Sequence, residues 1–346
     1  MHAKKLVTLA AVIIILAAVP GCALAGSAWE IQNPYDGVDW TRQYKANFHT
    51  HTTMSDGTAS PDAVIDAYAG LGYRILALTD HDTMGQGRDR NDPERSRTTW
   101  PWQRWDRDPD QVGMVAVHGN EISRVHHIGS YFIDYGDAAV DSAETAIEEI
   151  GRRGGLAVLF HPGRYDRPVE WYVEMYRTHS HLVGIEIYNQ GDRYPGDRAT
   201  WDAIQAELGA ERPVWAYSND DMHVPRRHLG RNWNVMLIDE LTEASVRRAM
   251  KDGTFYYVYH PGGHDGPPAP VIDSISVDPR RAVIRIEATG HERIDWISNG
   301  AVVHQGDQVE LEDVSELGAT IRAELHGADS DAVAGTQPFG LSPPER

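Results

Sequence analysis

Short apolar segments alternate with amphipathic segments from residue 45 to about residue 259. The apolar segments contain many β-branched and aromatic residues, which is typical of buried strands. Several amphipathic segments carry helix signals, such as Ser60 and Pro61 at one start and Gly154 after one end. The pattern predicts strands at 46–51, 75–79, 114–117, 130–134, 156–160, 184–188 and 213–217, and helices at 60–71, 141–153, 198–208 and 242–253. Because such alternation is typical of parallel βα units, it favours a barrel over an open sheet.

The pattern changes after the Gly/Pro-rich segment 262–270. Short segments with alternating apolar and polar residues follow, separated by turn residues such as Asn299-Gly300, which suits a tight hairpin. These segments are 272–277, 282–288, 294–298, 308–311 and 319–325. They predict a small antiparallel β-sandwich, with domain limits of 26–262 for the barrel and 263–346 for the sandwich.

A long segment without a clear period, 84–111, interrupts the barrel pattern. Loops of this length inside compact domains are usually either functional or disordered. Trp100, Trp102 and Trp105 make this one rich in aromatic residues. We therefore expect it to form a lid or a wall that faces the substrate.

The first 25 residues have the features of an export signal. Lys4 and Lys5 precede an apolar run, 6–19, that is short for a permanent membrane-spanning helix. Ala23-Leu24-Ala25 resembles a signal peptidase site, whereas the residues up to Cys22 resemble a lipoprotein box, and both alternatives stay open. We expect an exported protein of the periplasm or cell envelope, attached to a membrane only through a lipid anchor at Cys22.

The composition narrows the chemistry. The 346 residues include 32 Lys and Arg, 51 Asp and Glu, 17 His and one Cys, for a formal net charge of −19. A single Cys excludes an intramolecular disulfide framework and a multi-cysteine zinc site. The negative charge disfavours nucleic acid as a partner bound through its phosphate backbone. Many His and carboxylates together favour divalent metals, since these side chains bind such ions without thiolates.

Histidine and acidic residues gather at the ends of the predicted strands. His49 and His51 end the first strand, and residues two apart in a strand point to the same side, so both can bind one ion. Further strand ends and turns carry Asp56, His81, Glu121, His127, His161, Glu186, Asp221 and His223. In barrels of βα units, active sites lie on this rim. We therefore expect a multinuclear metal site there.

These motifs resemble those of a known superfamily. The run FHTHTTMSDGTASPDAVIDAYAGLGYRILALTDHDT, followed in order by GNEIS, HHIG, LFHPGRY and DMH, resembles the PHP (polymerase and histidinol phosphatase) superfamily over residues 45–260. The export signal and the β-rich C-terminal part look most like the carbaryl-hydrolase-like branch of stand-alone metallohydrolases. The resemblance implies a distorted (β/α)7 barrel that binds two or three divalent ions of zinc, manganese or iron.

The resemblance also implies a ligand set in three groups: His49, His51 and Asp221 for one ion; a bridging Glu121 with Asp56 and His81 for a second; and His127, His161 and His223 for a third. His127 is preferred over His126 because the superfamily places this ligand directly before an apolar residue and Gly. Asp220 and Asp221 are adjacent, and the spacing to His223 favours Asp221.

Such a centre predicts hydrolysis of a small phosphate ester, a monoester or a diester. Bound divalent metals lower the pKa of water to roughly 7, so a metal-bridging hydroxide would be the nucleophile. Asp80, His81 and Glu121 are the catalytic candidates, and Asp80 or a released ligand would protonate the leaving group. Arg124 and Arg164 either bind phosphate oxygens or form surface ion pairs.

Two alternatives remain. The same ions would polarise the carbonyl of a carbamate, amide or ester, and the Trp-rich segment would suit an aromatic substrate of this kind. A non-catalytic envelope protein that stores or senses metal is the second alternative. A complete ligand set argues against it.

Overall fold

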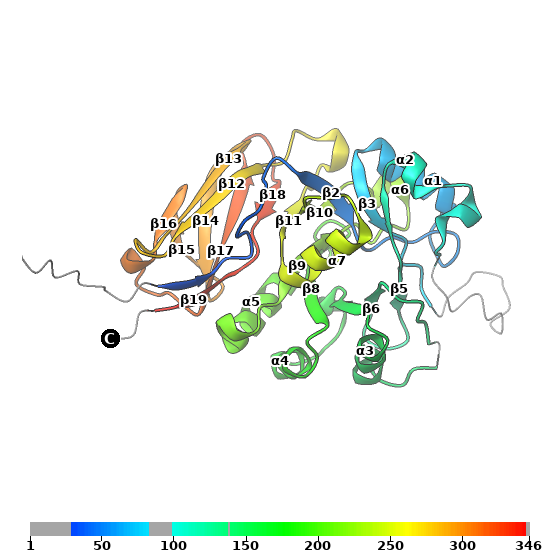
Figure 1. The fold of residues 1–346 in the computed structure, drawn as a ribbon, viewed down its shortest axis with the longest axis horizontal. Coiled ribbons are helices and arrows are strands. Elements are labelled where there is room, and N and C mark those ends of the chain that lie inside the picture. Colours follow the sequence, from blue (N-terminus) through cyan, green and yellow to red (C-terminus); the bar gives the residue numbers. More distant parts are fainter. Residues whose placement is uncertain (1–28, 83–98, 138, 344–346) are drawn as a thin grey trace, which may run out of the picture.

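The computed structural model describes residues 29–82, 99–137 and 139–343 (Figure 1). The export signal with Cys22, and residues 84–98 of the predicted insertion, lie outside the described residues. The chain forms two units that lie side by side: a larger one of strands and helices, and a smaller one built almost entirely of strands, at the left of Figure 1. Among the helices of the described part, none is long and apolar enough to cross a membrane.

Two β-sheets form the larger unit. The first contains, in spatial order, β11 (Phe255–Tyr259), β10 (Asn232–Leu237), β2 (Gln43–Asn47), β3 (Tyr73–Ala77) and β4 (Val115–Val117). The second contains β5 (Gly119–Ile122), β6 (Ile128–Tyr131), β7 (Leu156–Leu159), β8 (Leu182–Asn189) and β9 (Trp215–Asn219). Bridges from Thr50 to Met222 and from His81 to Glu121 join the sheets just beyond the carboxyl ends of β2 and β3. All the predicted barrel strands overlap strands of these sheets.

The direction of some strands differs from the prediction. β2, β3 and β4 are parallel, and so are β7, β8 and β9. However, β6 is antiparallel to both of its neighbours, and so is β10. Only residues 123–127 separate β6 from β5, whereas a parallel crossover needs a dozen residues or more. The mixed α/β class is therefore confirmed, but a regular series of parallel βα units is not what the described chain forms.

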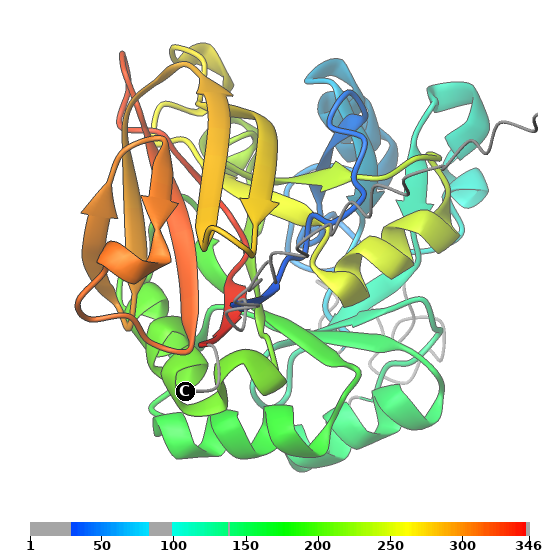
Figure 2. The same ribbon diagram turned by 60° about the vertical axis from the view of Figure 1, so that its left-hand side comes forward.

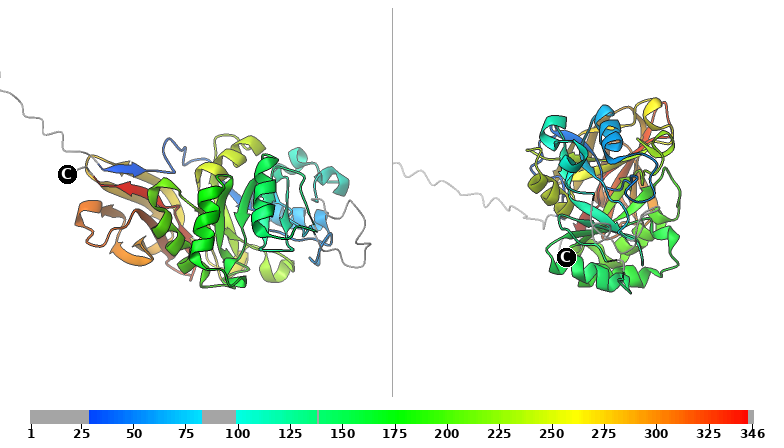
Figure 3. Two further views of the ribbon diagram at one scale, coloured as in Figure 1. Left: turned by 90° about the horizontal axis from the view of Figure 1, so that it is seen from below. Right: turned by 90° about the vertical axis from the view of Figure 1, so that its right-hand side faces the viewer.

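Helices cover the outside of the sheets. The predicted helices correspond to α1 (Pro61–Gly70), α3 (Ala143–Arg152), α5 (Asp197–Leu208) and α7 (Glu243–Asp252); α2 (Pro109–Val112) and α6 (Pro225–His228) are single turns. Helix α4 (Val169–Thr178) is not among the predicted helices, because its N-cap residue is Pro168, which makes no side-chain capping hydrogen bond and so provides no start signal. Helices α3, α4 and α5 lie in a row along one face (Figure 3).

The smaller unit has two antiparallel layers (Figure 2). One contains β12 (Val271–Asp278), β13 (Val283–Thr289) and β16 (Gln308–Glu310). The other contains β14 (His291–Ser298), β15 (Ala301–Gln305), β17 (Thr320–Gly327), β18 (Val333–Gly335), β19 (Phe339–Ser342) and the early strand β1 (Glu30–Gln32). Apolar residues of both layers, such as Ile286 and Trp296, are buried in one cluster. This arrangement resembles the predicted sandwich.

Strand pairing crosses the predicted limit between the two domains. β11 of the larger unit pairs with β18 of the smaller one, so one sheet passes through both. Tyr256 and Val258 of β11 belong to the same apolar cluster as Trp296. β1 pairs with β19, so the start of the described chain lies with its end. The limit at residues 262 and 263 stays a prediction, while the pairing couples the two units.

Candidate metal centre

All nine predicted ligand side chains meet beyond the carboxyl ends of β2, β3, β7 and β9, next to β5. Their potential ligand atoms form four overlapping groups, each within 4.8 Å. The groups are His49, His51 and Asp221; His81, Glu121 and His127; His49, Glu121 and His161; and His51, Asp56, His81 and His223. His49, His51 and Glu121 are fully buried, and Asp56 is the most exposed acid of the set, at 24% of its side chain.

Glu121 occupies the middle of this cluster. Its two carboxylate oxygens lie 2.6 Å from His127 Nδ1, 2.8 Å from His81 Nδ1, 3.4 Å from His49 Nε2, 3.4 Å from His51 Nε2 and 3.5 Å from His161 Nε2. Glu121 is on β5, and its partners come from the ends of β2, β3 and β7 and the start of β6. A carboxylate shared by this many imidazoles can bridge two cations, which is the role that the resemblance to the superfamily implies for Glu121.

The inward-facing atoms of this cluster fit bound cations. Buried polar atoms in proteins nearly always have hydrogen-bond partners. Here a group of buried atoms lie close to one another, and none of them makes a hydrogen bond of normal geometry: His49 Nε2, His51 Nε2, His81 Nδ1, His127 Nδ1, Asp221 Oδ1 and both oxygens of Glu121. Imidazole nitrogens and carboxylate oxygens are ligands of zinc, manganese and iron. The donor set therefore suits divalent metal ions, whose identity and number are proposals.

Electrostatics also favour cations at this position. Burial raises the pKa of Glu121, but the imidazoles of His127, His81 and His49 outweigh burial and hold this pKa well below its usual range. The pKa of Asp221 is likewise held well below its usual range, chiefly by His49 and His51 against the effect of burial. The centre therefore contains two ionised carboxylates that are both buried.

The structure groups the third predicted ligand set differently. His127 and His161 lie beside Glu121, but His223 lies on another side of the cluster, with Nε2 at 3.3 Å from Asp56 Oδ1. The backbone explains this position: Thr58 donates through its N–H to the carbonyl of His223, which ties the turn after β9 to the loop that contains Asp56. The grouping of His49, His51 and Asp221 agrees with the prediction.

Asp80 supports a loop and does not point freely into the centre. Its Oδ1 accepts hydrogen bonds from Thr52 N and Ser55 Oγ, at 2.7 and 2.6 Å. Its Oδ2 accepts from Thr52 Oγ1 and Thr99 Oγ1, at 2.7 and 2.6 Å. Since both oxygens are saturated, the structure argues against the predicted role of Asp80 as the proton donor to a leaving group. His81 and Glu121 do lie in the centre, so their predicted catalytic roles stay open.

Glu186 has no role in the predicted site, although it lies in the second half of β8, close to the candidate ligands. This carboxylate is fully buried on β8 and lies 2.9 Å from His49 Nδ1. It also accepts the backbone N–H of His161 at 3.0 Å. The signal that could have found it is its place in an apolar strand, because an acid within a buried strand needs a partner.

The predicted substrate-binding residues lie outside this cluster. Arg124 and Arg164 are exposed, on the loops after β5 and β7, and their predicted role in binding phosphate stays a prediction. Trp102 is buried against α1, so this part of the predicted lid or wall belongs to the core. Trp100 stacks on His118, with the ring centroids 5.4 Å apart.

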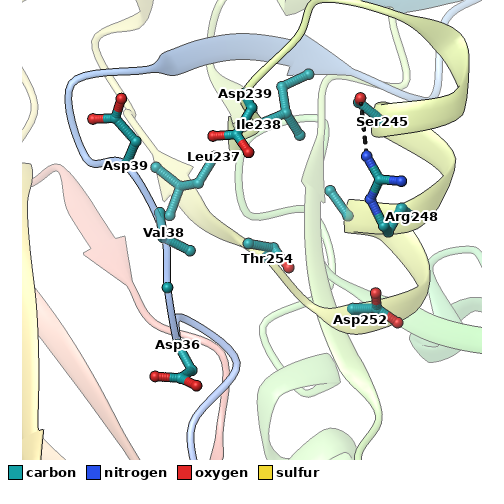
Figure 4. A pocket seen from close by; sticks show the side chains of 12 residues that line it. Asp36, Val38, Asp39, Leu237, Ile238, Asp239, Ser245, Arg248, Asp252 and Thr254 are labelled. Carbon is teal, nitrogen blue, oxygen red and sulfur yellow. Dashed lines mark hydrogen bonds between the residues drawn. The ribbon is translucent and has the colours of Figure 1, made fainter.

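A separate pocket of about 170 Å³ lies at the other end of β2 and β10 (Figure 4). Register places it there, since Leu237 in its lining pairs with Gln43 at the start of β2. Four acids, Asp36, Asp39, Asp239 and Asp252, line it together with Arg248, which donates to Ser245 Oγ at 3.2 Å. It shares no residue with the ligand groups, so it is not the candidate site.

Comparisons with known proteins agree with this geometry. The chain is 22% identical over 255 residues to the 5'-3' exoribonuclease Rnm of Escherichia coli K12, covering 52% of this chain and 85% of that protein. The same enzyme of Salmonella typhimurium LT2 is 23% identical over 256 residues, with the same coverage. No family model matches the chain.

A solved structure shares the fold over both units. It is a two-domain protein of Bacteroides vulgatus that contains a predicted PHP-like metal-dependent phosphoesterase. The TM-score is 0.55 and the sequence identity is 16%, over 90% of this chain and 98% of that one. At this identity the match shows a shared fold only, and that fold extends over both units of the chain. The fold and the sequence relatives therefore confirm the resemblance of this chain to the PHP superfamily.

Proposed function

We propose that this protein is a metal-dependent phosphoesterase that hydrolyses small phosphate esters. The observation that carries the proposal is the convergence of five imidazoles on the buried carboxylate of Glu121. In four of them, His49, His51, His81 and His127, the nitrogen that faces Glu121 makes no hydrogen bond of normal geometry. The relatives that are named as phosphoesterases or as an exoribonuclease support phosphate-ester chemistry. We propose two or three ions of zinc, manganese or iron, because the donor set contains only nitrogen and oxygen ligands.

The residues in and around the centre would have different roles in hydrolysis. Bound divalent ions would activate water and neutralise the charge that develops on the phosphoryl oxygens. Glu121 and Asp221 would hold the ions, since both are ionised and buried. Arg124 and Arg164, on the loops beside the centre, would bind non-bridging oxygens through their planar guanidinium groups.

Nucleic acid belongs among the substrates to be tested. The negative net charge disfavours binding to a phosphate backbone, but the comparisons give that exclusion no support, because two relatives are named as exoribonucleases. The positive charge of bound ions is local and acts at short range. A short RNA is therefore tested beside small esters.

The experiment compares the purified protein with variants of its centre. Bound metal is quantified, and hydrolysis is measured on a phosphomonoester, a phosphodiester, a short 5'-phosphorylated RNA and a carbamate, after loading with Mn²⁺ or Zn²⁺. We expect phosphate-ester hydrolysis that falls at least ~100-fold in His49→Ala and in His81→Ala. His304→Ala, at an exposed position of β15, is the matched control.

The outcomes separate the alternatives. Hydrolysis of the carbamate alone would favour the carbonyl hydrolase. Metal binding without turnover of any substrate would favour the non-catalytic envelope protein. Phosphate-ester hydrolysis that survives both His→Ala variants would refute the proposed centre.

We also propose that the protein is exported. The support is the signal-like sequence of residues 1–25, with Cys22 as a possible lipidation site. Cell fractionation tests export, and labelling with a radioactive fatty acid in the native sequence and in Cys22→Ser separates a lipoprotein from a freely secreted protein. Recovery in the cytoplasm without cleavage would contradict the proposal.

A further inference from the structure

Glu186 is a buried carboxylate with no place in the ligand groups of the metal centre. Four donors surround it: His49 Nδ1 at 2.9 Å and Asn219 Nδ2 at 2.9 Å on Oε1, and His161 N at 3.0 Å and Asn189 Nδ2 at 3.0 Å on Oε2. We propose that Glu186 is a positioning residue that orients His49 and His161 for metal binding. This inference rests on the proposed metal centre.

The first contact fixes the imidazole of His49. When Nδ1–H donates to Glu186, the other ring nitrogen keeps its lone pair for a metal. That nitrogen, Nε2, lies 3.2 Å from Asp221 Oδ1 and 3.4 Å from Glu121 Oε1, in the middle of the cluster. The ring of His49 also stacks on Phe160, with centroids 3.7 Å apart and planes 15° apart. Glu186 therefore sets the tautomer of His49, and Glu186 and Phe160 together fix the plane of its ring.

The second contact holds the backbone of His161. This residue has φ of 29°, in the left-handed region that a side chain other than that of Gly rarely adopts. Glu186 accepts the N–H of His161, and Asp197 accepts the N–H of Gly163 two residues later, at 2.7 Å. Two buried acidic side chains, Glu186 and Asp197, thus fix the turn that directs His161 toward Glu121.

Glu186 acts through these ligands and is not a ligand itself. Both of its oxygens are occupied by protein donors, and it belongs to none of the groups that could hold an ion. A carboxylate behind a metal-bound imidazole makes the ligand more basic and keeps its ring oriented. The single side chain links ligands from β2 and β7, which are far apart in the sequence.

The test replaces Glu186 and measures metal binding. In Glu186→Gln the amide NH₂ group replaces one carboxylate oxygen. It cannot accept the two hydrogen bonds that this oxygen accepts in the wild type. In Glu186→Asp the charge stays, but the shorter side chain would not reach His49 and His161 together. We expect both variants to bind Zn²⁺ about 10–100-fold more weakly in competition with a chelator. The absorption spectrum of the Co²⁺-loaded variants should also change.

Glu324→Gln is the matched control. Glu324 lies on β17 of the smaller unit, and its side chain is mostly buried. It accepts hydrogen bonds from Arg322 of the same strand and from Tyr257 of β11, so its replacement should lower the melting temperature and leave metal affinity unchanged. If the wild-type protein binds no metal, the proposed function fails. If the wild type binds metal, and every folded Glu186 variant binds it with the same affinity and Co²⁺ spectrum, the role of Glu186 is overturned. Glu186→Asp serves alone if Glu186→Gln does not fold.

Discussion

The carboxylates of Asp220 and Asp221 lie on opposite sides of the chain, although the two residues are neighbours. Asp221 Oδ1 lies 3.0 Å from His51 Nε2 and 3.2 Å from His49 Nε2, inside the metal centre. Asp220 accepts the backbone N–H groups of residues 230, 231 and 232 and the hydroxyl of Tyr68. A φ of 42° at Asp221 turns the chain at this point. One acid faces the centre, while the other holds the start of β10.

Because only Asp221 faces the centre, the same substitution at Asp220 and at Asp221 should have different effects. Asp221→Asn should lose at least ~10-fold in metal affinity and most of the hydrolytic rate, because it removes a charged ligand while the fold keeps its other contacts. Asp220→Asn should instead lower the free energy of unfolding by about 1–3 kcal/mol, because the amide cannot accept all four hydrogen bonds. Chelator competition and urea unfolding of both variants measure the two effects. Equal metal loss in both would contradict the assignment.

Asp80 provides a prediction about leaving groups. A proton donor matters most when the leaving group is a poor one, such as an alkoxide, and little for a nitrophenolate. Because Asp80 supports residues 52–55, Asp80→Asn should slow hydrolysis of alkyl and nitrophenyl esters by a similar factor. The rates on both ester classes give this ratio. A loss confined to the alkyl esters would restore the acid role that the structure argues against.

A buried ion pair joins the two units of the chain. Arg322 of β17 donates to Asp202 of α5 through Nε and Nη2, both at 3.1 Å, and Arg322 is only 5% exposed. Arg322→Met should lower the free energy of unfolding by about 3 kcal/mol, because Asp202 and Glu324 would lose their cationic partner.

The control for this ion pair is on the surface of the same unit. Arg293 pairs with Asp295 but is 45% exposed, so Arg293→Met should cost at most about 1 kcal/mol. Urea unfolding measures both changes. A similar small effect in the two variants would show that the buried pair does not hold the units together.

Asp197 makes stability depend on pH. Burial raises the pKa of this carboxyl from its ordinary value of 3.8 to about 8, and the charge of Glu186 adds to the rise while the N–H of Gly163 opposes it. The folded state therefore keeps a proton that the unfolded chain releases near pH 4, so stability from this group is present at low pH and is lost as pH rises toward 8.

The substitution Asp197→Asn should remove this dependence. At pH 5 the variant and the wild type should differ less in melting temperature than at pH 8.5, because Asp197 of the folded wild type is still neutral at pH 5. At pH 8.5 the variant should melt at least ~2 °C higher than the wild type. Taking the difference between the two proteins at each pH cancels the contribution of the other titrating groups. A constant difference from pH 5 to pH 8.5 would show that Asp197 does not titrate in this range.

Local pattern in the sequence located many elements of the larger unit and the residues of the candidate metal centre. The predicted barrel strands and helices overlap observed ones, because the buried face of each element shows in its own periodicity. The nine residues of the predicted metal centre could be selected from sequence because most of them lie within a few residues of a strand end. Strands that share a sheet bring their ends to one rim, and the His-x-His spacing already puts two imidazoles on one side.

The directions of the strands and the contact partners of the site residues are visible only in the tertiary structure. The reversal of β6, the position of His223 beside Asp56, and the saturation of Asp80 depend on contacts between segments far apart in the chain. The pairing of β11 with β18 likewise joins two units that the change in hydrophobic pattern after residue 262 separates. Periodicity reports which face of a strand is buried, but not which backbone groups will bond to it. For that reason Glu186 gained a role only when its four donors were placed around it.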